Sequence, residues 1–307
     1  MLKSLHIENY RLFKQLDIPK LGRVNLITGK NNVGKTALLE AIRIYVSSGE
    51  SSVINNIIYN RGDWGNRSIV EDYKSLFYKE GNHHAEMKIN DLEFILHDNH
   101  LLLYQSGEKR NVIRLGESNY KIPRDHAIVV NTKIDQNINH LWEEITLTFK
   151  EEIVINILKI IEPKLMQVAV DMSGDGTRVR LKHARNSISI KNLGDGIRRL
   201  LTIAIGLVSA ENSYLLIDEF DIGLHYSVQE ELWDAIFKLS KELNVQVFVT
   251  SHNKDCVEAF THTILKYNDE DSQYFRLQRK RNSELIESVK YTTRNLEVAL
   301  MSDIETR

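Results

Sequence analysis

The sequence predicts an α/β protein with a mixed central sheet, an N-terminal antiparallel lobe and an inserted β/α lobe. Three observations lead to this prediction: strand-like runs near the N-terminus, a glycine-rich loop that runs into a helical segment, and alternating helix and strand patterns after residue 191. Residues 1–50 and 190–307 are expected to form the core. Residues 51–189 are expected to form the inserted lobe, with β hairpins and a helical segment.

The N-terminal region contains three short apolar runs that indicate strands. They are centred on residues 5–7, 16–18 and 24–28, and the last one stands directly before the glycine-rich loop. Residues 37–45 follow the loop and indicate a helix. Residues 47–66 are rich in Ser, Asn and Gly, so we expect them to form a loop.

The inserted lobe combines alternating and helical patterns. Residues 85–130 hold short alternating runs, such as AEMKINDLEFIL and HLLLYQ, separated by the turn signals DNH and SGEK. These runs predict antiparallel strands. Residues 139–162 place apolar side chains at helical spacing, and Pro163 is expected to end that helix. The segment QVAVDMSGDGTRVRLKH then predicts a hairpin.

Composition limits the classes of function. The chain has 307 residues, of which 42% are apolar, and a net charge of -2, so neither nucleic-acid nor membrane binding follows from the overall charge. The single cysteine, Cys256, excludes an internal disulfide and suits a reducing cytosol. No apolar run approaches the ~18 residues of a membrane span, and the N-terminus lacks the apolar core of a signal peptide. We therefore expect a cytoplasmic protein without a membrane partner.

The glycine-rich loop has the spacing G-x-x-x-x-G-K-T, from Gly29 to Lys35-Thr36. Backbone N–H groups in such a loop can surround phosphates, the lysine can reach the β- and γ-phosphates, and the threonine hydroxyl can bind Mg²⁺. A chance glycine turn with an exposed lysine is the alternative, but the strand before and the helix after favour a phosphate site. The expected nucleotide contacts are Gly29, Asn31, Asn32, Val33, Gly34, Lys35, Thr36 and Ala37.

A second strand-like run, at residues 214–217, ends in Asp218-Glu219. Carboxylates at the carboxyl end of a buried parallel strand lie at the edge of the sheet where ligands bind. We expect Asp218 to bind Mg²⁺ together with Thr36, and Glu219 to act as general base for a water that attacks the γ-phosphate. Two solvated acids that end a strand are the simpler alternative.

A third run, at residues 245–250, ends in Ser251-His252-Asn253. A histidine at this edge can contact a γ-phosphate or the attacking water, although a lone histidine is more often structural. Because it ends the strand that follows the acidic one, we predict catalytic roles for Lys35, Glu219 and His252.

Together, the three strand ends resemble the ABC-type ATPase heads of the SMC, RecF and OLD-like proteins. LKSLHIENYRLFKQLDIPKLGRVNLITGKNNVGKTALLEAI is similar to their N-terminal lobe, YLLIDEFDIGLHYSVQEELWDAI to their Walker B strand and D-loop, and VFVTSH to their switch-histidine strand. The resemblance covers residues 1–45 and 190–260, and is nearest to compact OLD-like and Septu-like ATPases of bacterial antiphage systems. It implies a P-loop NTPase of the ABC/SMC-head type with ATP and Mg²⁺ as cofactors.

The resemblance also implies a dimer, or a higher homo-oligomer, in which two ATP molecules lie between two heads. The signature segment that would face the partner's ATP is LGDGIRR, residues 193–199, before a helix expected over 197–210. Its expected contacts are Gly194, Asp195, Gly196 and Arg198. The usual serine is Gly194 here, so hydrolysis is expected to be slower or to depend on Arg198. The alternative is an ordinary helix N-terminus.

The resemblance therefore implies an ATP-binding and hydrolysing dimeric switch. It would control a separate effector, such as a nuclease or toxin, in phage defence or DNA maintenance, with nucleic-acid contact as a further option. The alternative is a scaffold that holds ATP with little turnover and recruits a partner. Leu224-His225 replaces the usual Leu-Asp of a transporter D-loop, which disfavours a transporter ATPase. A small-molecule kinase would not account for both His252 and the signature segment.

Overall fold

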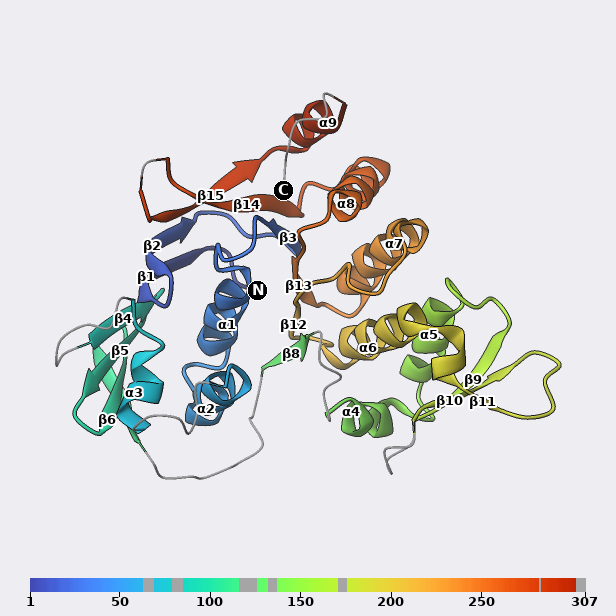
Figure 1. The fold of residues 1–307 in the computed structure, drawn as a ribbon, viewed down its shortest axis with the longest axis horizontal. Helices are drawn as coiled ribbons and strands as arrows, with labels where there is room; N and C mark the ends of the chain where they lie inside the picture. The colour runs from blue at the N-terminus through green and yellow to red at the C-terminus, as the bar shows by residue number, and fades with distance from the viewer. Residues whose placement is uncertain are drawn as a thin grey trace.

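The central sheet runs through the middle of the molecule (Figure 1). The computed structural model describes residues 1–62, 69–78, 85–115, 126–131, 137–170, 176–281 and 283–301. The strand order is β15-β14-β3-β13-β12-β8. The bounds are β3 (Val24–Thr28), β8 (Ala127–Val130), β12 (Tyr214–Ile217), β13 (Gln246–Thr250), β14 (Gln273–Arg279) and β15 (Ile286–Tyr291). All neighbours are parallel except β14 and β15, which pair antiparallel, so the predicted mixed α/β sheet is confirmed.

Helices cover both faces of this sheet (Figure 1). One face carries α1 (Lys35–Val46) and α2 (Ser51–Asn60), and the other carries α6 (Asp195–Ser209), α7 (Tyr226–Glu242) and α8 (Lys254–Tyr267). Neighbouring residues of a strand point to opposite faces. Accordingly, Leu26 packs in the hydrophobic cluster of α6, α7 and α8, and Ile27 packs in the cluster of α1. Every residue of β3 and β13 is buried, as expected for parallel strands between two helical layers.

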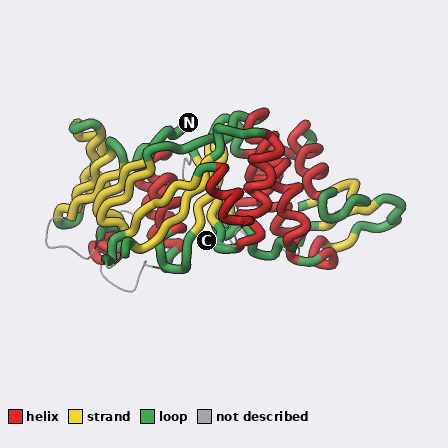
Figure 2. Tube along the Cα trace, turned by 90° about the horizontal axis from the view of Figure 1, so that it is seen from above, coloured by secondary structure: helices red, strands yellow, loops and turns green. Residues whose placement is uncertain are grey.

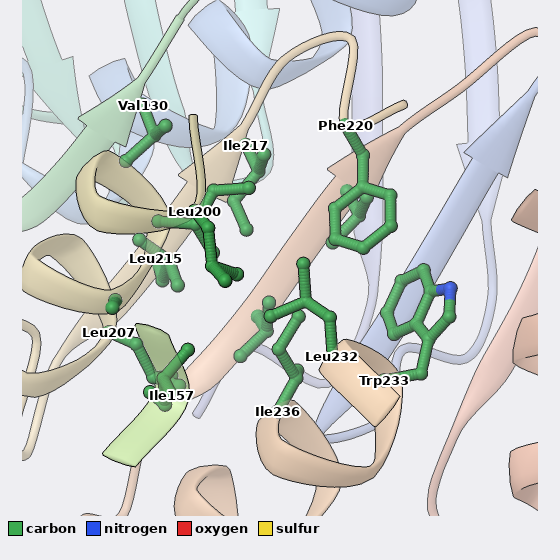
Figure 3. Close-up of a cluster of buried hydrophobic side chains, with 14 of the residues drawn as sticks. Val130, Ile157, Leu200, Leu207, Leu215, Ile217, Phe220, Leu232, Trp233 and Ile236 are labelled. Atoms are coloured by element: carbon green, nitrogen blue, oxygen red, sulfur yellow. The ribbon is translucent and has the colours of Figure 1, made fainter. Parts of the chain in front are cut away.

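The apolar cluster beneath α6 and α7 holds the end of β12 in place. Figure 3 shows Leu200 of α6, Ile217 of β12 and Leu232 of α7 pointing into one cluster. Phe220, which comes two residues after Asp218, stacks on Trp233 of α7 with ring centroids 4.6 Å apart. Buried aromatic pairs of this kind are stabilising. The backbone is therefore anchored on both sides of the acidic pair.

A second, antiparallel sheet has the order β2-β1-β4-β5-β6-β7. Its strands are β1 (Leu5–Tyr10), β2 (Phe13–Ile18), β4 (Ala85–Ile89), β5 (Leu92–His97), β6 (His100–Gln105) and β7 (Glu108–Arg114). The antiparallel strands predicted within residues 85–130 therefore join the N-terminal lobe, at the strand-rich end of the molecule (Figure 2).

A third group of elements packs against α6 at the other end of the molecule (Figure 2). It contains α4 (Asn137–Ile145), α5 (Phe149–Leu158), β9 (Leu165–Ala169), β10 (Arg178–Leu181), β11 (Ile188–Ser189) and the 3-10 turn η1 (Ile190–Leu193). The predicted hairpin is confirmed by the antiparallel pairing of β9 and β10. The helix predicted over residues 139–162 is two helices, because Leu147 has a positive φ of 62° and Thr148 caps a new helix start.

Two expectations about the insertion need correction. The loop expected at residues 47–66 is wrong, because α2 occupies half of that range and buries Val53, Ile54 and Ile57 on one face; residues 63–66 lie outside the described part of the chain. The strand β8, at the end of the segment expected to be antiparallel, is instead a parallel edge strand of the central sheet. The division of the chain at residues 50 and 190 stays a prediction, while strand pairing distributes the inserted segment over three sheets.

The remaining described helices are α3 (Ile69–Lys74) and α9 (Thr293–Met301). Among the helices of the described ranges, none combines the length and the apolar character that a membrane crossing requires.

Candidate functional site

The glycine-rich loop connects β3 to α1 at the carboxyl end of the central sheet. Gly29 and Gly34 have positive φ angles of 144° and 91°, and Gly34 is the N-cap of α1. A Cβ on Gly34 would lie 2.6 Å from the ring of Phe13, and one on Gly29 would lie 2.4 Å from the carbonyl oxygen of Leu277. Both positions therefore require glycine, and the loop keeps its backbone N–H groups and the positive end of α1 available for an anion.

Lys35, the first residue of α1, folds back across this loop. Its Nζ donates to the carbonyl oxygens of Gly29 at 2.7 Å and Lys30 at 3.1 Å. Burial lowers the pKa of Lys35, while the carboxylates of Asp218, Glu219 and Asp221 oppose that shift. The ammonium group thus lies where a phosphate held by the loop would be within reach.

The predicted loop residues contribute in two ways. Asn31, Asn32 and Thr36 are exposed, whereas the side chains of Val33 and Ala37 are buried in the core. Val33 and Ala37 can therefore offer only backbone groups to a nucleotide. Asn32 has a positive φ of 63°, which helps to turn successive N–H groups toward the inside of the loop.

Thr36 and Asp218 meet although 182 positions separate them in the sequence. The Thr36 hydroxyl donates to Asp218 Oδ2 at 2.7 Å, and the Thr250 hydroxyl donates to Asp218 Oδ1 at 2.5 Å. Mg²⁺ prefers oxygen ligands from a few protein groups together with water and phosphate. A hydroxyl and a carboxylate this close fit that requirement, so Thr36 and Asp218 are suitable magnesium ligands.

Glu219 follows in a strained turn. Its φ is positive, 52°, and its N–H donates to Thr250 Oγ1 at 2.9 Å. Phe220 N–H donates to the carbonyl oxygen of Thr250 at 3.0 Å. A positive φ is unfavourable for glutamate, and such conformations are maintained at functional sites by their surroundings. Thr250 and the packing of Phe220 hold the Glu219 turn beside Asp218.

His252 lies two residues beyond Thr250. Its side chain is exposed, in contrast to the preceding Ser251, whose hydroxyl donates to the buried Asp221 at 2.5 Å. Ser251 N–H also donates to the carbonyl oxygen of Ile27, so β13 leaves the sheet beside β3. The backbone before His252 is therefore fixed at the same sheet edge, with the imidazole facing solvent.

The signature segment forms the N-terminus of α6. The helix begins at Asp195, two residues earlier than the predicted start at Ile197, and Gly194 precedes it with a φ of 88°. Gly194 and Asp195 are exposed, and Arg198 pairs with Asp195 at 3.1 Å. A Cβ on Gly196 would come within 2.9 Å of the Gly223 carbonyl oxygen, so Gly196 allows α6 to approach the D-loop backbone.

The structure adds two residues that sequence reasoning missed. Thr250 contacts Asp218 and Glu219, and Arg199 of α6 donates to the backbone of the same turn. Arg199 could have been noticed as a charged residue inside the otherwise apolar helix face of residues 197–208. Thr250 gave no signal, because threonine is an ordinary residue at the end of a strand.

The loop after β3, the acidic end of β12 and the N-terminus of α6 lie at one edge of the sheet, and this arrangement defines a class of fold, the P-loop fold of the ABC/SMC-head type. A family model described as an AAA ATPase domain matches residues 1–173 and 124–257. These matches cover more than half of the chain, so it belongs to the AAA ATPase domain family.

Relatives agree with this assignment. The chain is 20% identical to an ATP/GTP phosphatase of Helicobacter pylori, over 86% of this chain and 88% of that protein. It is 22% identical to the DNA replication and repair protein RecF of Rickettsia typhi, over 85% of this chain and 97% of that protein. A shorter match, 36% identical, covers 26% of this chain and 36% of an uncharacterized protein of Methanocaldococcus jannaschii.

A solved structure confirms the fold. The SMC head bound to the C-terminal winged-helix domain of ScpA superposes with a TM-score of 0.62 at 14% identity, and covers 97% of this chain and 99% of that one. The predicted ABC/SMC-head fold is thereby confirmed. The residue roles, the metal and the dimer stay predictions.

Proposed function

We propose that this protein is an ATP-binding and hydrolysing dimeric switch that controls a partner effector. The observation that carries the ATP-binding and hydrolysing part of the proposal is the contact of Thr36 with Asp218 at 2.7 Å, beside Lys35 and Glu219. Phosphoryl transfer to water is well served by a hydroxyl and a carboxylate that can hold a metal ion, an ammonium group for the phosphates and a second carboxylate beside the attacking water.

In the proposed reaction, the loop N–H groups and Lys35 bind the β- and γ-phosphates of ATP. Thr36 and Asp218 would hold Mg²⁺, which supplies charge neutralisation to the phosphates when bound. Glu219 accepts the proton of the water whose oxygen bonds to the γ-phosphorus, while the bond between that phosphorus and the β,γ-bridging oxygen breaks. His252, at the end of the neighbouring strand, donates a hydrogen bond to a γ-phosphate oxygen.

The dimer is supported by the position of the signature segment. Gly194 and Asp195 are exposed at the positive end of α6, so this end is accessible to a γ-phosphate held by a second copy. The similar SMC head is bound to a separate protein, which supports an effector partner for this chain. An effector nuclease or toxin, an OLD-like role in phage defence and nucleic-acid contact rest on the resemblance alone.

A scaffold with little turnover is the second candidate, and one observation favours it. Gly194 offers no hydroxyl, and Arg198 is paired with Asp195, so the signature segment presents fewer donors to a γ-phosphate than the usual serine-containing form.

Turnover by the wild type and by Glu219→Gln separates the two candidates. Loss of a general base lowers turnover by about 10²- to 10⁴-fold, so the switch predicts a large drop in the variant while ATP affinity is retained. Phosphate release and ATP titration by calorimetry measure the two quantities. Equal, negligible rates with intact ATP binding would support the scaffold and reject the hydrolysing switch.

A further inference from the structure

Arg199 lies one turn into α6, and its guanidinium reaches the ends of two strands of the central sheet. Nη1 donates to the carbonyl oxygen of Asn131, directly after β8, at 2.6 Å. Nη2 donates to the carbonyl oxygens of Asp218 at 2.7 Å and Glu219 at 3.0 Å, directly after β12. One side chain therefore ties the signature helix to the backbone that carries both carboxylates.

The Arg199 guanidinium is buried, and its charge is compensated by groups of the turn that follows β12. Arg199 is 9% exposed, and its Nε has no hydrogen-bond partner in the described part of the chain. Burial lowers the pKa of Arg199, while Asp218, Asp221 and Glu219 favour its charged form. A buried charge is costly unless nearby groups compensate it. The hydrogen bonds go to carbonyl oxygens, so the carboxylates of Asp218 and Glu219 remain available for a metal ion and a water.

A second contact joins the same two elements. Gly196 packs so closely on the Gly223 carbonyl oxygen that a Cβ there would lie 2.9 Å from it. A Cβ on Gly223 would in turn lie 3.9 Å from the Arg199 Cβ and 3.9 Å from the Asp195 carbonyl oxygen. The first turn of α6 is thus in close contact with the backbone at Gly223 through Gly196, while Gly223 itself lies at ordinary contact distance from Arg199 and Asp195.

We propose that Arg199 is a positioning residue that couples the N-terminus of α6 to the orientation of Asp218 and Glu219 in the same chain. The proposal rests on the dimeric switch described above. A γ-phosphate of the partner's ATP that binds at Gly194–Gly196 shifts α6, and Arg199 carries this shift to Glu219. Each bound ATP thereby controls hydrolysis at the other site, which is a coupling between two sites in thermodynamic terms.

The chain offers a matched control for the test. Arg23 also donates to backbone carbonyl oxygens, those of Ser240 at 3.0 Å and Val245 at 3.4 Å, but at the amino end of the sheet. Arg199→Met and Arg23→Met each remove a guanidinium that bonds to backbone carbonyl oxygens, while they keep most of the side-chain volume. Arg199→Lys keeps the charge, but an ammonium group cannot reproduce the guanidinium's hydrogen bonds to three carbonyl oxygens.

The experiment measures turnover against ATP concentration, together with thermal melting, for wild type and the three variants. Arg199→Met should lower kcat by about 10- to 100-fold, which is the usual loss when a residue that orients metal-binding groups is removed. It should leave KM within about 3-fold and reduce a Hill coefficient above unity to about 1. Arg199→Lys should recover part of kcat, and also serves as the test if the Met variant does not fold. Arg23→Met should lower the melting temperature and leave kcat unchanged.

Two results would overturn the proposal. One is wild-type kcat and Hill coefficient in both Arg199 variants. The other is an Arg199→Met variant with a lower melting temperature and weaker ATP binding but an unchanged turnover rate per folded molecule. That result would make Arg199 a structural residue. If wild type and Glu219→Gln both lack turnover, the hydrolysing switch fails. The coupling is then tested by sigmoidal ATP binding in Glu219→Gln with and without Arg199→Met.

Discussion

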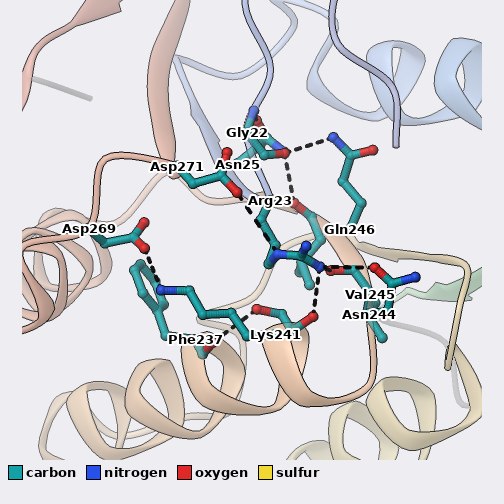
Figure 4. A network of polar contacts seen from close by, with 12 residues as sticks. Gly22, Arg23, Asn25, Phe237, Lys241, Asn244, Val245, Gln246, Asp269 and Asp271 are labelled. Carbon is teal, nitrogen blue, oxygen red and sulfur yellow. Dashed lines mark hydrogen bonds and ion pairs between the residues drawn. The ribbon is translucent and has the colours of Figure 1, made fainter.

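The two ends of the central sheet use polar side chains in different ways. At the amino end, Asn25 and Gln246 bond only to the backbone of neighbouring segments (Figure 4). At the carboxyl end, Lys35, Thr36 and Asp218 bond to each other or to their own loop. The first network connects the N-terminal segment to the sheet. The groups of the second network could exchange their present partners for a ligand.

At the amino end, Gln246 and Asn25 satisfy every hydrogen-bonding group of their side-chain amides. Gln246 accepts from Leu2 N–H at 2.7 Å and donates to the carbonyl oxygens of Leu2 and Gly22 at 2.8 and 2.7 Å. Asn25 closes a similar ring with Gly22, and both amides are almost fully buried. Buried groups with all partners present make a rigid network. This end therefore fixes the sheet, and the carboxyl end is supported by it.

Lys35→Ala should give the largest effect on the carboxyl end. It removes a buried ammonium that would form charge-assisted bonds to phosphate, so ATP affinity should fall by about 10- to 100-fold. Calorimetric titration of ATP measures the change. Lys238→Ala, on the exposed side of α7, is the matched control and should bind as wild type does. Unchanged affinity in Lys35→Ala would place the nucleotide elsewhere.

Thr250→Val should have an intermediate effect on the same end. The substitution keeps the shape but removes the hydroxyl that donates to Asp218 and accepts from Glu219 N–H. We expect turnover to fall by about 10-fold, because the turn is less well oriented, while ATP affinity changes little. Thr250→Ser retains the hydroxyl and should keep most of the activity. A loss of the same size in both variants would assign the effect to packing.

Gln246→Leu should have the smallest effect on function, and its effect on stability sharpens the comparison. It removes the side-chain partner of the Leu2 N–H and of the Leu2 carbonyl oxygen, while the Gly22 carbonyl oxygen keeps its bond from Asn25 Nδ2. The free energy of unfolding should fall by about 2–3 kcal/mol, measured by chemical denaturation. Turnover per folded molecule should equal that of wild type. A reduced kcat at full folding would show that the two ends are not independent.

The sequence was sufficient to predict that the phosphate-loop residues and the acidic strand end meet at one edge of the sheet, while their roles stay predictions. Gly29, Lys35 and Asp218 were predicted because the loop spacing and the carboxyl ends of parallel strands have direct physical consequences. Arg199 was missed, because its role depends on the approach of α6 to β12, a tertiary contact between segments with no shared pattern. Arg198, its half-buried neighbour, was predicted instead because it occupies the position implied by the family resemblance.

The sequence predicted the fold class more reliably than the place of each strand in its sheet. The parallel core followed from buried apolar runs. The place of β8 did not, because a four-residue strand carries no information on which sheet it joins or in which direction. Residues 51–60 were expected as a loop from their Ser and Asn content, yet Val53, Ile54 and Ile57 supply a buried helical face. Tertiary burial there outweighed local composition.

The most direct test of the account is an experimental structure of the protein with Mg²⁺ and a non-hydrolysable ATP analogue. The account predicts the γ-phosphate within hydrogen-bond distance of Lys35 Nζ, the metal ion bound by Thr36 Oγ1 beside Asp218, and the Glu219 carboxylate facing the γ-phosphate. A nucleotide bound away from the loop of residues 29–36, or a metal ion that neither Thr36 nor Asp218 approaches, would contradict it.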